Sequence, residues 1–140
     1  MFTVVWGLIS FRNEILIGKK REGPHPYGLG GKWHIIGGRV EKNESEEEAL
    51  KREIREETGL KIQNIRKLSE RIFKNLKGEK VKLVVFYCEV RNKNAKAMSD
   101  LEEVKWVKKE KLLEEVCERV RKDLISMENV MKFLKGRITF

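Results

Sequence analysis

The residues best suited to catalysis lie in the stretch 38–60, where glutamates recur inside a predicted helix. Ser45 followed three residues later by Glu48 is a capping box, in which each side chain accepts a hydrogen bond from the backbone of the other residue. Good helix formers follow, and Gly59 can adopt the left-handed conformation that ends a helix. The pattern therefore predicts a helix that begins at Ser45 and ends near Thr58.

The acidic side chains of this helix are expected to share one stripe. At about 100° per residue, Leu50 and Ile54 lie on one face, and the acidic stripe lies beside that face. Its members are Glu46, Glu53, Glu56 and Glu57. Like charges three or four residues apart oppose helix formation by roughly 0.2–0.5 kcal/mol per pair, so the stripe needs a counter-charge.

Two kinds of counter-charge fit the stripe. A hard divalent cation such as Mg²⁺ or Mn²⁺ takes carboxylate oxygens, waters and substrate phosphates. The Gly37-Gly38 turn just upstream lets a backbone oxygen approach the same ion. The alternative is an ordinary solvated face, neutralised by Arg52 and Arg55 on the same helix. The first interpretation predicts a metal site built on the helix.

The wider spacing favours the metal site. The stretch reads glycine, five residues, glutamate, seven residues, Arg-Glu, an aliphatic residue, any residue, Glu-Glu, any residue, glycine and an aliphatic residue. The fixed places are filled by Gly38, Glu44, Arg52, Glu53, Ile54, Glu56, Glu57, Gly59 and Leu60. This pattern resembles the signature of the Nudix hydrolase family. The sequence departs from that family just upstream, where Ile36 stands in place of a common proline.

The resemblance implies an α/β fold, in which a central mixed sheet is sandwiched between helices. It also implies Mg²⁺- or Mn²⁺-dependent hydrolysis of a pyrophosphate bond in a nucleoside diphosphate linked to a further group. The small nucleotides that fit this description are (d)NTPs, ADP-ribose and dinucleoside polyphosphates. Two alternatives stay open: an enzyme that acts on capped or triphosphorylated RNA ends, and a nucleotide-binding regulatory domain without catalysis.

The resemblance also implies roles for single residues. The expected metal ligands are Glu53, Glu56, Glu57 and a backbone oxygen of Gly37 or Gly38. Glu53 is expected either to bind the ion or to orient and deprotonate the attacking water, and Arg52 is expected to orient Glu53 through charge-assisted hydrogen bonds. Glu44 is expected to support the helix entry. Arg52, Glu53 and Glu56 thus form the predicted catalytic group.

Two further acidic residues are candidates for the site. In the Nudix family, an acidic residue near a tryptophan often completes the metal site or supplies a base. Glu102 and Glu103 precede Trp106 in a predicted strand of this sequence. Either of them is therefore a candidate base or additional ligand.

Three residues are candidate substrate contacts. Arg21 ends a run of three cations after the predicted strand 14–18, and its planar fork suits phosphate oxygens. The same run also fits a charge cluster that protects a strand end. Tyr27 lies in the Pro- and Gly-rich loop 22–31, where it either stacks on a base or ribose or packs against the loop's own stem. Arg39 directly follows the glycine turn.

The rest of the chain is expected to supply the scaffold. Patterns of apolar and β-branched residues predict strands at 2–11, 14–18, 33–36, 61–74, 80–91 and 103–107. Helical periodicity covers 109–135, with a break near 123–126. The segment 82–88 is apolar on both faces, which predicts a central strand in a sheet covered on both sides. We therefore predict one three-layer domain over residues 1–140.

Composition limits location and partners. Hydrophobic residues make up 40% of the chain, and no apolar run approaches the roughly 20 residues that span a membrane, so we expect a soluble protein without a membrane partner. No secretory signal is evident, and Cys88 and Cys117 lack zinc-site spacing, which predicts reduced thiols in a cytoplasmic protein. The net charge of +9 fits either nucleic acid or anionic small substrates. A monomer and a homodimer are equally compatible with the sequence.

Overall fold

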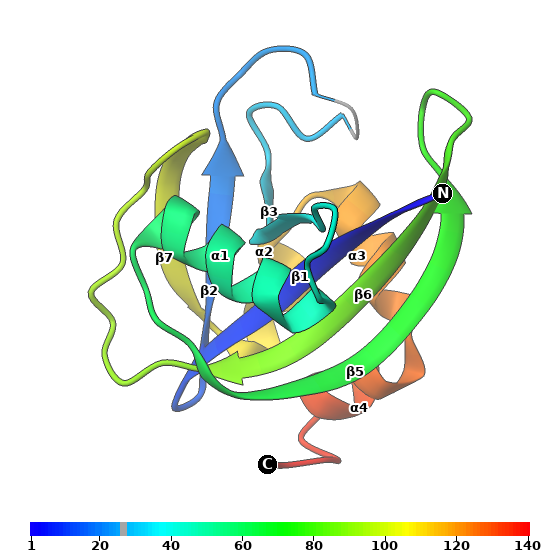
Figure 1. Ribbon diagram of the computed structural model, residues 1–140. Helices are drawn as coiled ribbons and strands as arrows, with labels where there is room; N and C mark the ends of the chain where they lie inside the picture. Colours follow the sequence, from blue (N-terminus) through cyan, green and yellow to red (C-terminus); the bar gives the residue numbers. More distant parts are fainter. Residues whose placement is uncertain (26–27) are drawn as a thin grey trace.

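The computed structural model describes residues 1–25 and 28–140, and it shows a sheet with helices on both faces (Figure 1). The strands are β1 (Phe2–Phe11), β2 (Glu14–Lys20), β3 (Trp33–Ile35), β4 (Gly37–Arg39), β5 (Gln63–Lys74), β6 (Lys80–Glu89) and β7 (Leu101–Lys108). The helices are α1 (Glu46–Thr58), α2 (Leu112–Glu115), α3 (Glu118–Ile125) and α4 (Glu128–Leu134), with a 3₁₀ turn at Lys109–Lys111. Within these described ranges, no helix is long and apolar enough to cross a bilayer.

Strand β1 organises the sheet. It pairs in parallel with β6 along most of its length, from Phe2 opposite Val81 to Ser10 opposite Glu89. It pairs antiparallel with β2 only near the hairpin, and beyond that point the two strands separate. In the space between them, β3 pairs with β2 and β4 pairs with β1. The segment 33–39 is therefore wedged into the open end of the sheet and carries the glycine turn with it.

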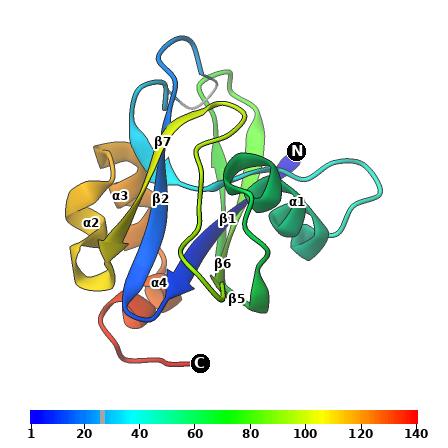
Figure 2. The same cartoon turned by 90° about the vertical axis from the view of Figure 1, so that its left-hand side faces the viewer.

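Two hydrophobic clusters hold the three layers together. On one face, Leu50 and Ile54 of α1 pack against the sheet. On the other face, Val120 and Leu124 of α3 and Val130 of α4 pack against it. Figure 2 shows α1 on one side of the sheet and α2, α3 and α4 on the opposite side. Strand β6 contributes side chains to both clusters, so the predicted α/β/α arrangement with a mixed central sheet is confirmed.

Local hydrogen bonds fix both ends of α1. The Glu48 backbone N–H donates to Ser45 Oγ at 3.0 Å, and the Ser45 N–H donates to Glu48 Oε1 at 2.9 Å. At the other end, Gly59 has a φ of 77°, and its N–H donates to the Arg55 carbonyl. The predicted limits of this helix are confirmed, because both signals act between residues close in sequence.

Ser45→Ala should lower the free energy of unfolding by about 1 kcal/mol, because the Glu48 N–H loses its acceptor. Turnover should change little, since the candidate catalytic glutamates lie in the second half of α1. Urea denaturation of the wild type, Ser45→Ala and Ser45→Thr measures the effect. Threonine keeps the hydroxyl and should restore most of the loss. Equal stability of all three proteins would contradict the capping role.

Two parts of the chain differ from the sequence-based prediction. Residues 37–39 form strand β4, because they pair with β1 instead of serving only as a turn. The region 109–135 contains a second break, at Val116, which is extended. Just after it, the Cys117 N–H donates to the Trp33 carbonyl at 3.0 Å. This long-range bond ties the C-terminal helices to β3, and no local pattern in the sequence signals it.

Candidate active site

A cavity of about 210 Å³ opens where the β3–β4 segment meets the second half of α1. Its polar lining comes from β2, from His25 in the loop after β2, from the β3–β4 segment, from α1 and from the end of the 92–100 loop. These lining residues include Lys20, Gly37, Gly38, Glu53, Glu57 and Asp100. The fold thus brings the glycine turn and two of the candidate glutamates to one place.

Glu57 is the most unusual residue of this cavity. Its side chain is only 3% exposed, and neither carboxylate oxygen has a hydrogen-bond partner among the described residues. Burial raises the pKa of the carboxyl to about 9, although the Lys20 ammonium, 3.8 Å away, acts in the opposite direction. A buried carboxylate without hydrogen bonds is costly, so packing alone gives no reason for a glutamate at this position.

Lys20 also contacts a carboxylate that the sequence pattern did not indicate. Its ammonium donates to Asp100 Oδ2 at 2.9 Å. The candidate Glu102 instead pairs with Lys19 at 3.7 Å, and Glu103 is exposed and lies opposite Lys19 in the β2–β7 ladder. Of these three acidic residues, only Asp100 lines the cavity.

Glu53 lies directly against the glycine turn. A Cβ atom on Gly38 would be 2.3 Å from Glu53 Cδ, so the backbone passes the carboxylate with no space for a side chain. Arg52 holds the same carboxylate, donating from Nη1 to Glu53 Oε1 at 2.8 Å. The Arg52 guanidinium also donates to both Glu44 oxygens, at 2.7 and 2.9 Å, and to the Arg39 carbonyl at 3.0 Å. The two bonds from Arg52, together with one from the Glu41 backbone N–H, lower the pKa of Glu44 to about 2. The bonds of the guanidinium to Glu44, Glu53 and the Arg39 carbonyl fix its orientation.

The other glutamates of the helix do not gather at Glu57. The Glu56 side chain is 55% exposed and lies 3.5 Å from Arg52 Nη1. Glu46 belongs to the first turn of α1 and pairs with Lys82 at 3.1 Å. In the described part of the chain, no three His, Cys, Asp or Glu side chains converge closely enough to hold a metal ion. The metal-ligand set therefore stays a prediction, and it requires the Glu56 side chain to turn toward Glu57.

The candidate substrate contacts occupy different places. Arg39 lines the cavity, with its guanidinium carbon 3.9 Å from the centroid of the Phe2 ring. Arg21 is exposed outside the cavity, and its backbone N–H donates to the Asp100 carbonyl at 3.1 Å. Tyr27 lies outside the described residues. Arg39 is thus the candidate best placed to meet a ligand.

His34 also lines the cavity. The ring is buried, its Nδ1 lies 2.7 Å from the Ile35 carbonyl, and its Nε2 has no hydrogen-bond partner among the residues described. Burial lowers its pKa to about 4, so the ring is neutral at pH 7. Because the Ile35 carbonyl selects the tautomer with a proton on Nδ1, Nε2 presents a lone pair that can accept a hydrogen bond.

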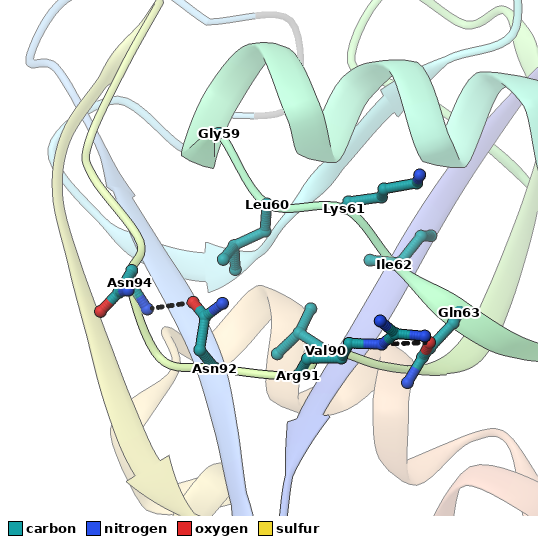
Figure 3. A pocket seen from close by; sticks show the side chains of 9 residues that line it. All are labelled: Gly59, Leu60, Lys61, Ile62, Gln63, Val90, Arg91, Asn92 and Asn94. Atoms are coloured by element: carbon teal, nitrogen blue, oxygen red, sulfur yellow. Dashed lines mark hydrogen bonds between the residues drawn. The ribbon is translucent and has the colours of Figure 1, made fainter.

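A larger cavity, of about 430 Å³, lies beyond the C-terminal end of α1, between the α1–β5 and β6–β7 connections (Figure 3). Its polar side chains are amides and cations. For example, Arg91 Nε donates to Gln63 Oε1 at 3.2 Å. None of its described lining residues is acidic, and none is a histidine, serine or cysteine. The candidate active site is therefore the smaller cavity.

The chain is similar to several known proteins. Residues 1–126 of the chain match the NUDIX domain family. Over 85 residues, the chain is 39% identical to the 8-oxo-dGTP diphosphatase of Buchnera aphidicola subsp. Schizaphis graminum. This aligned region is 59% of this chain and 59% of that protein. Over 53 residues, it is 45% identical to the NAD-capped RNA hydrolase NudC of Mannheimia succiniciproducens. This aligned region is 38% of this chain and 20% of that protein. The chain thus spans less than two thirds of the length of either curated relative.

The fold is also shared with solved structures. The MutT protein from Methanosarcina mazei Go1 superimposes with a TM-score of 0.74 at 27% sequence identity. The similarity covers 99% of this chain and 96% of the other. The layers and the sheet described above are therefore common to both proteins.

Proposed function

The chain belongs to the NUDIX family, and we therefore propose that it is a metal-dependent pyrophosphohydrolase that acts on a small nucleotide. The bond cleaved is a pyrophosphate bond in a nucleoside diphosphate linked to a further group, as in a (d)NTP, ADP-ribose or a dinucleoside polyphosphate. The observation that carries this proposal is Glu57, a buried carboxyl group at the cavity that holds the glycine turn, whose two oxygens accept no hydrogen bond from the described residues. One relative is named an 8-oxo-dGTP diphosphatase, and that name describes the same class of reaction.

The residues at the site fit a divalent cation. The Glu57 oxygens offer hard ligands that no described protein group satisfies, and the close approach of Gly38 to Glu53 leaves backbone and carboxylate side by side. Asp100 is a further carboxylate at the same cavity. Mg²⁺ or Mn²⁺ would be held by Glu56, Glu57 and a backbone oxygen of Gly37 or Gly38, with Glu53 either as a further ligand or as the group that orients the attacking water. When bound, the ion would neutralise phosphate oxygens and so reduce their repulsion of the attacking water.

The protein's own groups would divide the remaining work. Arg52 holds the Glu53 carboxylate in one orientation, which suits it to orient a water molecule and accept its proton. The Lys20 ammonium and the Arg39 guanidinium are cations at the cavity wall and would bind phosphate oxygens. This assignment separates water activation, at Glu53, from phosphate binding, at the two cations.

A second candidate function is hydrolysis at the 5′ end of an RNA. The net charge of +9 favours it, as does the similarity to NudC, a NAD-capped RNA hydrolase. Steep salt dependence of RNA binding would support it, because each neutralised phosphate releases counterions. A nucleotide-binding domain without catalysis is the third candidate, and metal-independent binding without turnover would support that one.

Product release from a panel of nucleotides tests these candidates. The panel contains dGTP, ADP-ribose, a diadenosine polyphosphate and triphosphorylated RNA, each with Mg²⁺ or Mn²⁺. We expect turnover of a small nucleotide, and we expect Glu56→Gln to reduce it by roughly 100-fold or more while the free energy of unfolding changes little. Near-normal turnover by Glu56→Gln would remove this residue as a ligand. Nucleotide binding without turnover of any substrate would contradict the enzymatic function and support the function as a regulatory domain.

A further inference from the structure

The cavity beyond the C-terminal end of α1 forms where β5 and β6 separate. Their ladder begins at the pair Gln63 and Glu89, and residues of the two neighbouring segments, 59–62 and 90–94, line the opening (Figure 3). Within the described residues, no backbone hydrogen bond joins these two segments. The volume of about 430 Å³ lies within the range of small-molecule sites, roughly 300–1,000 Å³. The opening is therefore large enough to hold a ligand.

The polar groups that are free in this cavity are mostly hydrogen-bond donors. Gln63 Oε1 already accepts from Arg91 Nε at 3.2 Å, and Asn92 Oδ1 already accepts from the Asn94 N–H at 2.9 Å. The side-chain N–H groups of both amides are left, together with both Nη atoms of Arg91 and the ammonium of Lys61. None of these groups has a partner within residues 1–25 and 28–140. A ligand that fits must therefore be rich in acceptors.

The charge at this place favours an anion. Lys61 and Arg91 line the cavity, and Lys96 follows shortly after the second lining segment. All three are exposed, and none pairs with a carboxylate in the described part of the chain. Other cations are neutralised, as Lys82 is by Glu46 at 3.1 Å. Since none of the described lining residues is acidic, a bound anion meets no like charge there.

We propose that this cavity binds a nucleoside monophosphate, at a site separate from the active site, with the phosphate between Lys61 and Arg91. The Arg91 guanidinium is held through Nε, so its two Nη groups can donate together to two phosphate oxygens. A phosphate group fills only part of a cavity of about 430 Å³. The free amide N–H groups of Asn92 and the apolar side chain of Leu60 are then left for the sugar and the base.

A ligand in this position would join two segments that lead to the active site. One segment begins where α1 ends, and the other continues into the 92–100 loop. The Lys96 N–H donates to the Thr58 carbonyl at 3.1 Å. The Met98 N–H donates to the Glu57 carbonyl at 2.9 Å. A bridging ligand should make the opening of these two bonds rarer, because it holds the loop and the end of α1 together.

Backbone amide NMR spectra in EDTA, which removes divalent cations, test the inference site by site. Titration with AMP should shift the signals of residues 59–63 and 90–94, whereas the Gly38 signal reports the active site. At saturation, hydrogen exchange of the Lys96 and Met98 N–H groups should slow by about threefold or more. Adenosine, which lacks the phosphate, should cause no shift, and inorganic phosphate should bind at the same place but more weakly than AMP.

Arg91→Gln and Lys61→Gln should each weaken AMP binding by about fivefold, because each removes one charge-assisted contact. Arg137→Gln and Lys77→Gln are the matched controls. They remove the same charges from exposed positions outside the lining of the cavity, in the C-terminal segment and in the β5–β6 turn. Both controls should bind AMP within about twofold of the wild type, since charges farther apart than about 10 Å are screened at 0.1 M salt.

Four results would overturn the inference. They are AMP shifts confined to the region of Gly38, adenosine or inorganic phosphate that binds as tightly as AMP, equal weakening of AMP binding in the control variants, and unchanged exchange of the Lys96 and Met98 N–H groups at saturation. The titration requires neither a metal ion nor turnover. Its failure would therefore leave the proposed function intact, and an inactive protein that gives the expected shifts would contradict the proposed function alone.

Discussion

Replacing Glu57 by glutamine is expected to lower turnover by roughly 100- to 1,000-fold, because the amide cannot supply the anionic ligand that a divalent cation requires. The same change should leave the metal-free protein as stable as the wild type or more stable. At neutral pH the wild-type carboxyl must take up a proton to stay uncharged in this buried position, whereas an amide is uncharged without one. Loss of activity together with retained stability is the signature of a residue kept for function.

The measurement combines steady-state turnover with thermal unfolding in Mg²⁺ and in EDTA. Mg²⁺ should raise the melting temperature of the wild type and have little effect on Glu57→Gln, because a ligand stabilises only the state that binds it. Glu47→Gln is the matched control, since Glu47 is an exposed glutamate in the first turn of the same helix. Retention of more than about a tenth of wild-type turnover by Glu57→Gln would remove Glu57 from the ligand set.

The pH dependence of stability in EDTA gives an independent check on Glu57. Its folded-state pKa of about 9 lies above the ordinary value of 4.5, so the folded protein binds a proton that the unfolded chain releases between these values. The contribution of this carboxyl to the free energy of unfolding should therefore fall as the pH rises from about 4.5 to about 9. Glu57→Gln should remove that part of the slope, and an unchanged slope would contradict the raised pKa.

The parts of the fold that the sequence predicted are those specified locally. The limits of α1 depend on the capping box at Ser45 and on Gly59, both of which act within a few residues. The hairpin of β1 and β2 and the central position of β6 follow from apolar patterning of single segments. Strand β4 depends instead on pairing with β1, and the break at Val116 is followed by the bond from the Cys117 N–H to the Trp33 carbonyl; both partners are distant in sequence.

In the candidate site, too, the locally specified features were predicted and those that depend on distant residues were not. The spacing of the glutamates predicted that they would share α1, but it did not show that Glu57 is buried while Glu56 is exposed. At Glu57 the C-terminal end of α1 is covered by the 92–100 loop, where the Met98 N–H donates to the Glu57 carbonyl at 2.9 Å, and by Lys20 of β2, 3.8 Å from the carboxylate. The loop also turns Asp100 into the cavity and leaves Glu102 on the surface. No residue pattern within the loop encodes this direction.

Gly38→Ala should lower turnover by about 100-fold or more while the protein stays folded. The new Cβ would lie 2.3 Å from Glu53 Cδ and within 2.6 Å of both its oxygens, so the carboxylate must move. Its bond to Arg52 would then break, and a displacement of about 1 Å at a reacting group typically costs a factor of about 100 in rate. The atoms in the way are the far end of a flexible side chain, so the free energy of unfolding should change much less than the turnover.

The neighbouring glycine provides the contrasting variant. In Gly37→Ala the new Cβ would lie 1.9 Å from the Val5 carbonyl oxygen, which belongs to the backbone of β1 and cannot rotate away. Strand β4 would have to separate from β1, at a cost of about 3 kcal/mol or more in the free energy of unfolding. Urea denaturation and turnover measured on both variants should therefore show opposite patterns, with stability lost mainly in Gly37→Ala and activity lost at nearly full stability in Gly38→Ala. Wild-type turnover by Gly38→Ala would mean that the Glu53 carboxylate works from a position other than the one beside the glycine turn, and its role as the group that orients water would have to be given up.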